Sequence, residues 1–265
     1  MAELPEIELF KEKLQRIVLR KKLGKLRQLN AKGEQSAEAG GLGEDALLGK
    51  EITDIHRYGT QIFWELDRRE ILALQLGGEL AMELERGLPV AGEEGRAGLE
   101  IAINANLRLR LQGAQLGTRL RLLDEDSDVD FLTKLGPDPI LVPKPGLESL
   151  RESLARRRSA LRNVLLDDSF VTGIGPIWAD EILFQARLRP DRLVPTLSED
   201  DRQRLCEQIR QVLERALRSQ AKIPLLPRTF LTRHREDGHC PACGGPLEQI
   251  SVGGRMAVFC PSCQL

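Results

Sequence analysis

The sequence predicts an α+β protein whose β-rich half precedes a helical half and a small C-terminal unit. Three observations support this class. Apolar and polar residues alternate between about residues 51 and 123, apolar residues recur at helical spacing before and after that region, and four of the five cysteines lie after residue 236. Alternation at period two indicates half-buried strands, whereas spacing of three and four indicates helices. The 265 residues suffice for two modest domains and a small module.

The first helix is predicted near the N-terminus, where the chain begins MAELPEIE. Four apolar residues recur at three- and four-residue spacing and define one face: Ile7, Phe10, Leu14 and Ile17. Pro5 suits the first turn, because the amide hydrogen that proline lacks would have no helical partner there. Residues 30–49 are rich in glycine, alanine, glutamate and serine, which is typical of a loop.

The region from about 51 to 123 is predicted to form a two-sheet β-sandwich. In residues 107–112 leucines alternate with Arg108, Arg110 and Gln112, and residues 118–123 repeat the pattern. Residues 70–76 and 100–103 are more apolar strand candidates. Turn signals recur at intervals of roughly ten residues, which favours a sandwich or barrel over alternating strands and helices. Together with the first helix, these strands predict a domain over residues 1–134.

The second half is predicted to be helical. Residues 135–146 carry four of the fourteen prolines and are expected to form a linker. Helical spacing follows over about residues 147–166 and 176–187, with a turn at Gly173-Ile174-Gly175. A further helix is expected after Ser198, an N-cap residue with Asp201 at the third helical position. We therefore expect a helical domain over residues 147–236 and a third unit over 237–265.

The C-terminal unit is predicted to be a zinc ribbon. Its cysteines follow the pattern C-x2-C-x16-C-x2-C, which is the spacing of a four-cysteine zinc site. The expected ligands of one structural Zn²⁺ are Cys240, Cys243, Cys260 and Cys263. Metal binding would supply the folding energy of a segment too short for an apolar core. Redox disulfides are the alternative, although a cytosol keeps thiols reduced. The fifth cysteine, Cys206, is expected to be a buried thiol.

The composition excludes a membrane protein. Apolar residues make up 41% of the chain and charged residues 30%. No stretch reaches the roughly 18 uncharged apolar residues that a membrane helix requires. Acidic and basic residues interrupt the N-terminus, where a signal peptide would have an apolar core. We therefore expect a cytoplasmic protein.

Charge is unevenly distributed although the net charge is only -1. Residues 11–27 hold eight basic residues against one acid, and residues 156–158 with Arg162 form a second basic cluster. Acids gather elsewhere, for example in residues 124–130. This asymmetry would suit a protein with one side facing DNA, although solvated helix faces produce the same pattern.

Three separated motifs resemble the formamidopyrimidine-DNA glycosylase and endonuclease VIII family of base-excision repair enzymes. Members typically start MPELPEVE and contain a helix–two-turn–helix close to LLDQxxxxGIGNIYADEILF. This chain has MAELPEIE and LLDDSFVTGIGPIWADEILF. Members end in a zinc ribbon with Gly-Arg shortly before Cys-x-x-Cys-Gln, and this chain has GGRMAVFCPSCQ. The resemblance spans the whole chain in order. It implies a DNA-repair hydrolase with damaged-base DNA glycosylase and AP lyase activity.

The mechanism that the resemblance implies begins at the N-terminus. Removal of Met1 would expose the α-amine of Ala2, which attacks C1′ of the damaged nucleotide and forms a Schiff base before elimination cuts the strand. An α-amine with a pKa of roughly 7.7–8.0 is partly neutral, and hence nucleophilic, near neutral pH. Glu3 is expected to move protons at the sugar, and Glu6 to shape the site. Such enzymes flip the target nucleotide out of the stack.

DNA contacts are expected from five residues. Arg255 matches the ribbon arginine with which the family holds phosphates beside the lesion. Gly173 and Gly175 flank a helix start whose N–H groups suit phosphate, although a plain helix hairpin is the alternative there. Arg162 belongs to the second basic cluster, and Thr60 lies at the family's hairpin contact. The expected partner of this nucleoid-associated monomer is damaged, abasic, single-stranded or distorted DNA.

Departures from the family pattern all fall in its catalytic and DNA-probing set, whereas the folding motifs are intact. They are Ala2 for proline, Thr60 for a hairpin lysine, Gly78 for a methionine wedge, Gln115 and Leu116 for an Arg-Phe wedge, and Pro176 for a phosphate-binding asparagine. Three functions therefore stay open: a divergent glycosylase and lyase, a non-catalytic relative that binds DNA structures or lesions, and a zinc-ribbon module that binds another protein.

Overall fold

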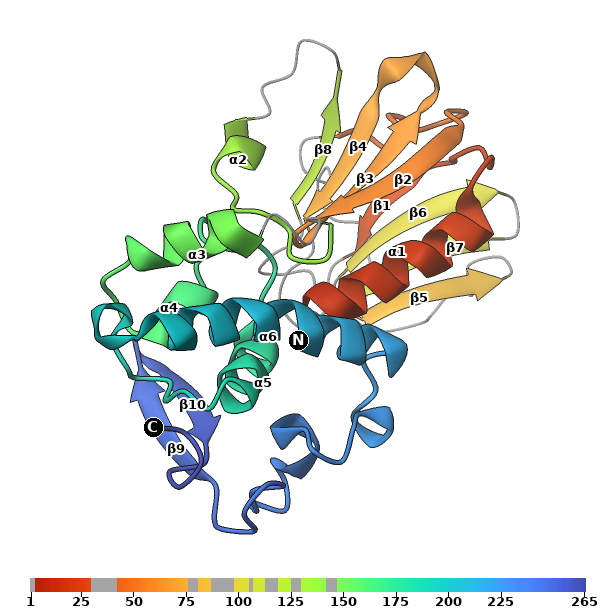
Figure 1. Cartoon of the computed structure of the whole chain (residues 1–265). Helices are drawn as coiled ribbons and strands as arrows, with labels where there is room; N and C mark the ends of the chain where they lie inside the picture. Colours follow the sequence, from red (N-terminus) through yellow and green to blue (C-terminus); the bar gives the residue numbers. More distant parts are fainter. Residues whose placement is uncertain are drawn as a thin grey trace. The chain divides into compact units, whose positions relative to one another are not determined.

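The computed structural model describes residues 3–29, 42–75, 81–86, 98–104, 107–112, 119–124, 130–141 and 147–265. The chain folds into two compact units, whose helices and strands are labelled in Figure 1. The first unit includes residues 7–129, and the second combines residues 3–6 with residues 130–265. Across the described ranges, no helix is long and apolar enough to cross a membrane.

Helix α1 (Leu4–Val18) begins in the second unit and continues in the first. Leu4 is buried in the core of the second unit, whereas Ile7 and Leu14 are buried in the core of the first. The predicted apolar face is correct except at its end, where Val18 is fully buried and Ile17 only partly. Both residues share a face with Leu14, since positions i+3 and i+4 are neighbours on a helix.

The first unit contains two four-stranded antiparallel sheets, as the alternation predicts, except that one strand (residues 26–29) precedes the predicted region of 51–123. One sheet has the order β1-β6-β7-β5 and the other the order β2-β3-β4-β8. The strands are β1 (Leu26–Leu29), β2 (Ile52–Tyr58), β3 (Gln61–Leu66), β4 (Ile71–Gln75), β5 (Ala81–Arg86), β6 (Gly98–Asn104), β7 (Leu107–Gln112) and β8 (Arg119–Leu123), with the short helix η1 (Asp67–Arg69) between β3 and β4. Strands and α1 share one apolar core, in which Trp64 is fully buried.

The polar face of β7 is covered more than alternation alone predicts. Arg108 keeps only 7% of its surface exposed, because carboxylates on both neighbouring strands pair with it. Its guanidinium lies 3.2 Å from Glu100 on β6 and 3.6 Å from Glu85 on β5. Arg110 pairs with the same two carboxylates. Cross-strand ion pairs of this kind stabilise a sheet modestly.

The described part of the second unit is helical up to its C-terminal hairpin. Its elements are α2 (Asp130–Thr133), α3 (Leu147–Ala155), α4 (Leu161–Leu165), α5 (Pro176–Gln185), η3 (Val194–Thr196), α6 (Glu199–Arg218), η4 (Ile223–Leu225), η5 (Leu231–His234), β9 (Glu248–Val252) and β10 (Arg255–Phe259). The antiparallel hairpin β9–β10 follows η5 (Figure 1).

The single helix expected over residues 147–166 is instead two helices, α3 and α4. The backbone leaves the helix between them to pair with the segment before η3, where Ala160 forms a β-bridge with Leu193. The N–H of Leu161 also donates to the carbonyl of Arg192. Tertiary pairing therefore overrides a sequence whose local spacing is helical throughout.

Helix α5 is the central helix of the second unit. Every residue from Trp178 to Phe184 is buried, so this helix is apolar nearly all round. It packs in one core with α3, α4, α6 and Leu4 of α1. Two charged residues inside this run, Asp180 and Glu181, are buried with it. Buried charges need partners, and those partners organise the site.

Candidate active site and zinc ribbon

Glu3 caps the N-terminus of helix α5. One carboxylate oxygen, Oε1, accepts the N–H of Ile177 at 2.9 Å, and Oε2 accepts the N–H of Trp178 at 3.1 Å. The first residue of the helix, Pro176, has no N–H to offer. A residue from the start of the chain thus satisfies helix donors that otherwise have no partner.

Burial moves the pKa of Glu3 into the physiological range. The side chain is almost completely buried, and the loss of hydration raises the pKa of Glu3 to about 7. The hydrogen bonds from Ile177 and Trp178 oppose this rise, while the nearby charge of Glu6 adds to it. A carboxyl whose pKa lies near 7 can both accept and donate a proton at neutral pH, which suits general acid–base catalysis.

Glu6 lies beside Glu3 and contacts the same helix. Its Oε2 accepts the backbone N–H of Glu3 at 3.1 Å and the indole N–H of Trp178 at 3.3 Å. Burial raises the pKa of Glu6 above its ordinary value. Two carboxyl groups with raised pKa values therefore flank one tryptophan, and each is held by hydrogen bonds to fixed groups.

The two predicted phosphate-binding glycines lie beside the start of helix α1: Gly175 next to the side chain of Glu3, and Gly173 next to the backbone of Leu4. A Cβ on Gly175 would lie 2.2 Å from the carboxyl carbon of Glu3, so only glycine leaves room for the cap. Gly173 has a φ of +86° and accepts the N–H of Leu4 through its carbonyl. We expected the N–H groups of α5 to face outward toward phosphate. This is wrong for Ile177 and Trp178, because Glu3 occupies their N–H groups.

Several predicted residues fall elsewhere or outside the described ranges. Thr60 lies in the first unit, at the turn between β2 and β3, beside Gly59 with its φ of +57°. Buried Arg57, near the end of β2, donates to the carbonyl of Gly59 and pairs with Glu8. The remaining predicted positions lie outside the residues that the structure describes: Ala2, Gly78, Gln115 and Leu116.

Arg255 begins strand β10 directly after the hairpin turn. Gly253 and Gly254 form this turn with φ values of +61° and +77°, as tight two-residue hairpins require. Arg255 is exposed. No hydrogen bond or ion pair of its guanidinium to another described residue is observed, so the charge is directed to solvent. Its position is compatible with the predicted contact to a DNA phosphate.

Arg162 is completely buried, so it cannot touch DNA as we expected from the basic cluster. Its Nε donates to Asp180 Oδ1 at 2.7 Å. Its two terminal nitrogens donate to the carbonyls of Arg255 and Met256, at 3.3 and 2.7 Å. The physical reason is that α4 packs between α5 and the hairpin, which encloses its second residue.

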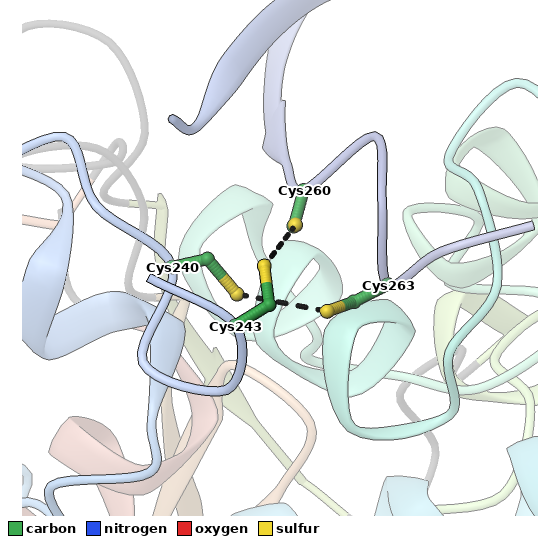
Figure 2. A group of neighbouring side chains, drawn as sticks. All are labelled: Cys240, Cys243, Cys260 and Cys263. Carbon is green, nitrogen blue, oxygen red and sulfur yellow. Dashed lines mark hydrogen bonds between the residues drawn. The ribbon is translucent and has the colours of Figure 1, made fainter. Parts of the chain in front are cut away.

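The four predicted cysteine ligands converge on one point (Figure 2). All four sulfur atoms lie within 4.8 Å of one another, with 3.8 Å between Cys240 and Cys263 and 3.6 Å between Cys243 and Cys260. Tetrahedral Zn²⁺ with Zn–S bonds of about 2.3 Å requires sulfurs roughly 3.8 Å apart. The donor set and its geometry therefore fit one structural Zn²⁺. Cys206 is buried in α6, far along the chain from this group.

The sequence patterns described above do not predict the roles of Asp180, Glu181 and Arg235. Glu181 accepts the N–H groups of Leu231 and Thr232, which anchors η5. Asp180 binds both Arg162 and Arg235. The available signal was an acidic pair inside the apolar run WADEILF, since adjacent charges in a buried helix require partners.

Family models match three consecutive parts of the chain. The one described as "Formamidopyrimidine-DNA glycosylase N-terminal domain" matches residues 1–122, and "Formamidopyrimidine-DNA glycosylase H2TH domain" matches residues 135–225. The one described as "Zinc finger found in FPG and IleRS" matches residues 239–265 and so includes all four cysteine ligands.

Full-length relatives are also named formamidopyrimidine-DNA glycosylase. The chain is 33% identical over 281 residues to the formamidopyrimidine-DNA glycosylase of Thermus thermophilus, covering 100% of this chain and 98% of that one. It is 28% identical over 273 residues to the enzyme of Pelobacter propionicus, with 100% of both chains covered. Lactococcus lactis Fpg, crystallised with DNA containing an abasic site, has the same fold, with a TM-score of 0.83 over 100% of both chains at 23% identity. The chain therefore belongs to the formamidopyrimidine-DNA glycosylase family.

Proposed function

We propose that this protein is a DNA glycosylase with AP lyase activity, acting on damaged DNA through the N-terminal amine of Ala2. The observation that carries the proposal is the cap on α5. It holds the carboxyl of Glu3, one residue after the proposed nucleophile, with a pKa of about 7. Membership of a family whose relatives are named formamidopyrimidine-DNA glycosylase supports the glycosylase part of the proposal.

The proposed reaction needs one nucleophile and one proton shuttle. The neutral amine of Ala2 adds to C1′ as the bond from C1′ to the damaged base breaks, and the base leaves with a proton. Loss of the amine proton and opening of the sugar then give the imine, for which protonated Glu3 donates a proton to the ring oxygen. Deprotonated Glu3 can next assist removal of a proton from C2′, and the bond from C3′ to oxygen then breaks, so the 3′-phosphate leaves by β-elimination. Water finally hydrolyses the imine and restores the amine.

Binding is proposed to depend on Arg255 and on a substrate that is already open. The exposed Arg255 guanidinium is a suitable donor to a phosphate oxygen. The methionine and Arg-Phe wedges of the family are replaced here, so little in the sequence is suited to filling a gap in duplex DNA. We therefore propose a preference for abasic, single-stranded or distorted DNA, in which the nucleotide is more easily flipped.

Borohydride trapping tests the proposal. Protein is first shown by mass spectrometry to begin at Ala2 and is then mixed with single-stranded and duplex DNA containing an abasic site, with borohydride present. We expect a covalent adduct at Ala2, formed faster on the single strand. Protein chemically acetylated at its N-terminus is the control and should form none. Absence of an adduct from protein that begins at Ala2 would overturn the lyase mechanism.

A non-catalytic DNA-binding relative is the second candidate. It is favoured by Pro176, which replaces the family's phosphate-binding asparagine, and by Thr60 in place of the hairpin lysine. This candidate predicts specific binding to abasic DNA without an adduct. A zinc-ribbon module for another protein, the third candidate, predicts no DNA binding in a gel-shift assay at low salt.

A further inference from the structure

One buried carboxylate joins the zinc ribbon to the helices. Asp180 of α5 is 1% exposed. Its Oδ1 accepts from Arg162 at 2.7 Å, and its Oδ2 accepts from Arg235 at 3.0 Å and from the backbone N–H of Val258 at 3.1 Å. The partners come from α4, from the segment after η5, and from β10. Three separate parts of the second unit therefore meet at this one side chain.

Arg162 extends this connection to the exposed arginine. Its guanidinium bonds to Asp180 on one edge and to the carbonyls of Arg255 and Met256 with its terminal nitrogens. A guanidinium is planar and presents its donors in a rigid fork, so fixing one edge fixes the direction of the others. The backbone at Arg255 is thus located by a chain of two buried side chains that begins on α5.

The zinc site supports the hairpin at the end opposite its turn. An isolated two-stranded hairpin is marginally stable. The zinc ligands Cys260 and Cys263 follow β10 and hold its far end, whereas Arg255 lies next to the turn. Asn163, which follows Arg162, lies against Gly253 so closely that an added Cβ would approach its Oδ1 to 2.5 Å. Helix α4 therefore holds the turn end of the hairpin.

Helix α5 carries the proposed acid–base group on the same rigid element. Glu3 binds the N–H of Ile177, and Asp180 follows three residues later, about 4.5 Å along the helix axis. Arg235 lies between the two, since it donates to Asp180 and to the carbonyl of Ile177. One helical turn therefore separates the attachment of Glu3 from the attachment of the hairpin.

We propose that Asp180 is a positioning residue that sets where Arg255 lies relative to Glu3. A phosphate held by Arg255 would then have a fixed position relative to the carboxyl of Glu3. This inference rests on the proposed function, because it assumes that Arg255 binds DNA. Buried ion pairs stabilise proteins poorly compared with apolar packing, so a network of two arginines and one aspartate is better explained by the geometry that it imposes.

A double-mutant cycle between Asp180 and Arg255 tests the proposal. Affinity is measured for single-stranded DNA with a stable tetrahydrofuran abasic analogue, at several salt concentrations. We expect R255Q to weaken binding by at least about tenfold and to reduce the salt slope by about one phosphate contact. D180N should weaken binding by a similar factor. It should also reduce the dependence of affinity on salt concentration by the same amount. The double variant should bind no worse than R255Q alone, because the two changes remove one interaction.

Two further variants separate positioning from stability. R162K keeps a cation beside Asp180 but loses donors to the carbonyls of Arg255 and Met256, so it should also reduce the salt slope. E181Q changes the adjacent buried carboxylate, which anchors η5, and should leave DNA affinity within about twofold. Zinc content and thermal unfolding are measured for each variant. If D180N fails to fold, R162K and its double variant with R255Q decide the matter.

The outcomes distinguish the two proposals. In one outcome, wild-type protein traps abasic DNA, and D180N and R162K either bind DNA as wild type does or weaken binding additively with R255Q. This result would overturn the positioning role and leave the proposed function standing. Wild-type protein that neither traps nor binds abasic DNA overturns both. Loss of the same phosphate contact in D180N, R162K and R255Q, without loss of zinc, supports the positioning role.

Discussion

Two helices of the second unit differ in how the N–H groups at their N-termini are capped. Helix α6 is capped by its own neighbour, because Ser198 accepts the N–H of Asp201 at 3.1 Å and Asp201 accepts the N–H of Ser198 at 3.3 Å. Helix α5 is capped by Glu3, from 174 residues away in the sequence. A local cap serves the helix alone, whereas a distant cap also holds the distant residue in place.

The two capping carboxylates also differ in their affinity for protons. Burial works against the charge of Asp201, but hydrogen bonds from Ser198 and the nearby arginines lower the pKa of Asp201 below its ordinary value. Glu3 is buried more deeply, and its pKa is raised to about 7. Asp201 is therefore charged at neutral pH, whereas Glu3 is divided between both forms. The difference indicates which cap is structural and which is available for chemistry.

The largest expected effect, and the clearest difference between the two caps, comes from replacing Glu3 and Asp201 with their amides. We expect Glu3→Gln to slow borohydride trapping on abasic DNA by about 10²- to 10⁴-fold, because the amide cannot move a proton. Asp201→Asn should trap at the wild-type rate. Single-turnover trapping rates, with zinc content and thermal unfolding as folding controls, make the comparison. Equal rates for Glu3→Gln and wild type would remove Glu3 from the proposed mechanism.

The stability of the same two variants should depend on pH in opposite directions. Folded Glu3 keeps its proton up to about pH 7, whereas the unfolded residue loses it near 4.5. Unfolding therefore releases a proton between these values, and the free energy of unfolding falls as pH rises across this window. Relative to Glu3→Gln, wild type should lose about 3 kcal/mol between pH 4.5 and 7. Urea denaturation at several pH values measures the difference.

Asp201 provides the opposite sign. Its pKa is lowered from 3.8, so its stabilising effect is present above that value and is lost as pH falls through the folded pKa. Asp201→Asn should therefore be least stable relative to wild type at neutral pH, and its stability should approach that of wild type in acid.

The raised pKa of Glu3 has its own test. A difference in stability between Glu3→Gln and wild type that does not change between pH 4.5 and 7 would contradict it.

The contrast between the caps also explains what could be predicted from the sequence. Ser198 and Asp201 are three positions apart, so the capping box is visible as a local pattern, and its prediction is confirmed. The zinc ligands are similarly recognisable from spacing, and the four sulfurs do converge. The alternation in residues 107–112 corresponds to β7. In each case the information lies within a few residues or in a repeated interval.

Contacts between distant parts of the chain left no such pattern. Nothing near Gly175 in the sequence indicates that its missing side chain makes room for Glu3. Arg162 belongs to a basic cluster and was predicted to face DNA, but packing of α4 against α5 buries it. The helical spacing of residues 147–166 likewise did not reveal the bridge between Ala160 and Leu193. Charge and periodicity indicate what a residue prefers, whereas burial depends on partners elsewhere.

A smaller effect on stability and trapping is expected when the space that Glu3 occupies beside Gly175 is filled and both carboxylates are kept. A Cβ at Gly175 would lie 2.2 Å from the Glu3 carboxyl carbon, so Gly175→Ala must displace the cap. We expect a loss of about 1–3 kcal/mol in the free energy of unfolding by urea, together with slower trapping. Gly43→Ala is the matched control, because its Cβ would meet no atom within 4 Å. If the two substitutions have equal effects, Glu3 does not depend on the space at Gly175.

Removal of the local cap should have the smallest effect, and its effect should be limited to stability. Ser198→Ala deletes the hydroxyl that accepts the N–H of Asp201, which typically costs about 1 kcal/mol. Ser198→Asp keeps an acceptor and should restore most of that loss in urea denaturation. Trapping of abasic DNA should be unchanged in both, because no proposed catalytic group is attached to α6. Slower trapping in Ser198→Ala would mean that the α6 cap also supports the site, and the distinction between a structural cap and a catalytic one would fail.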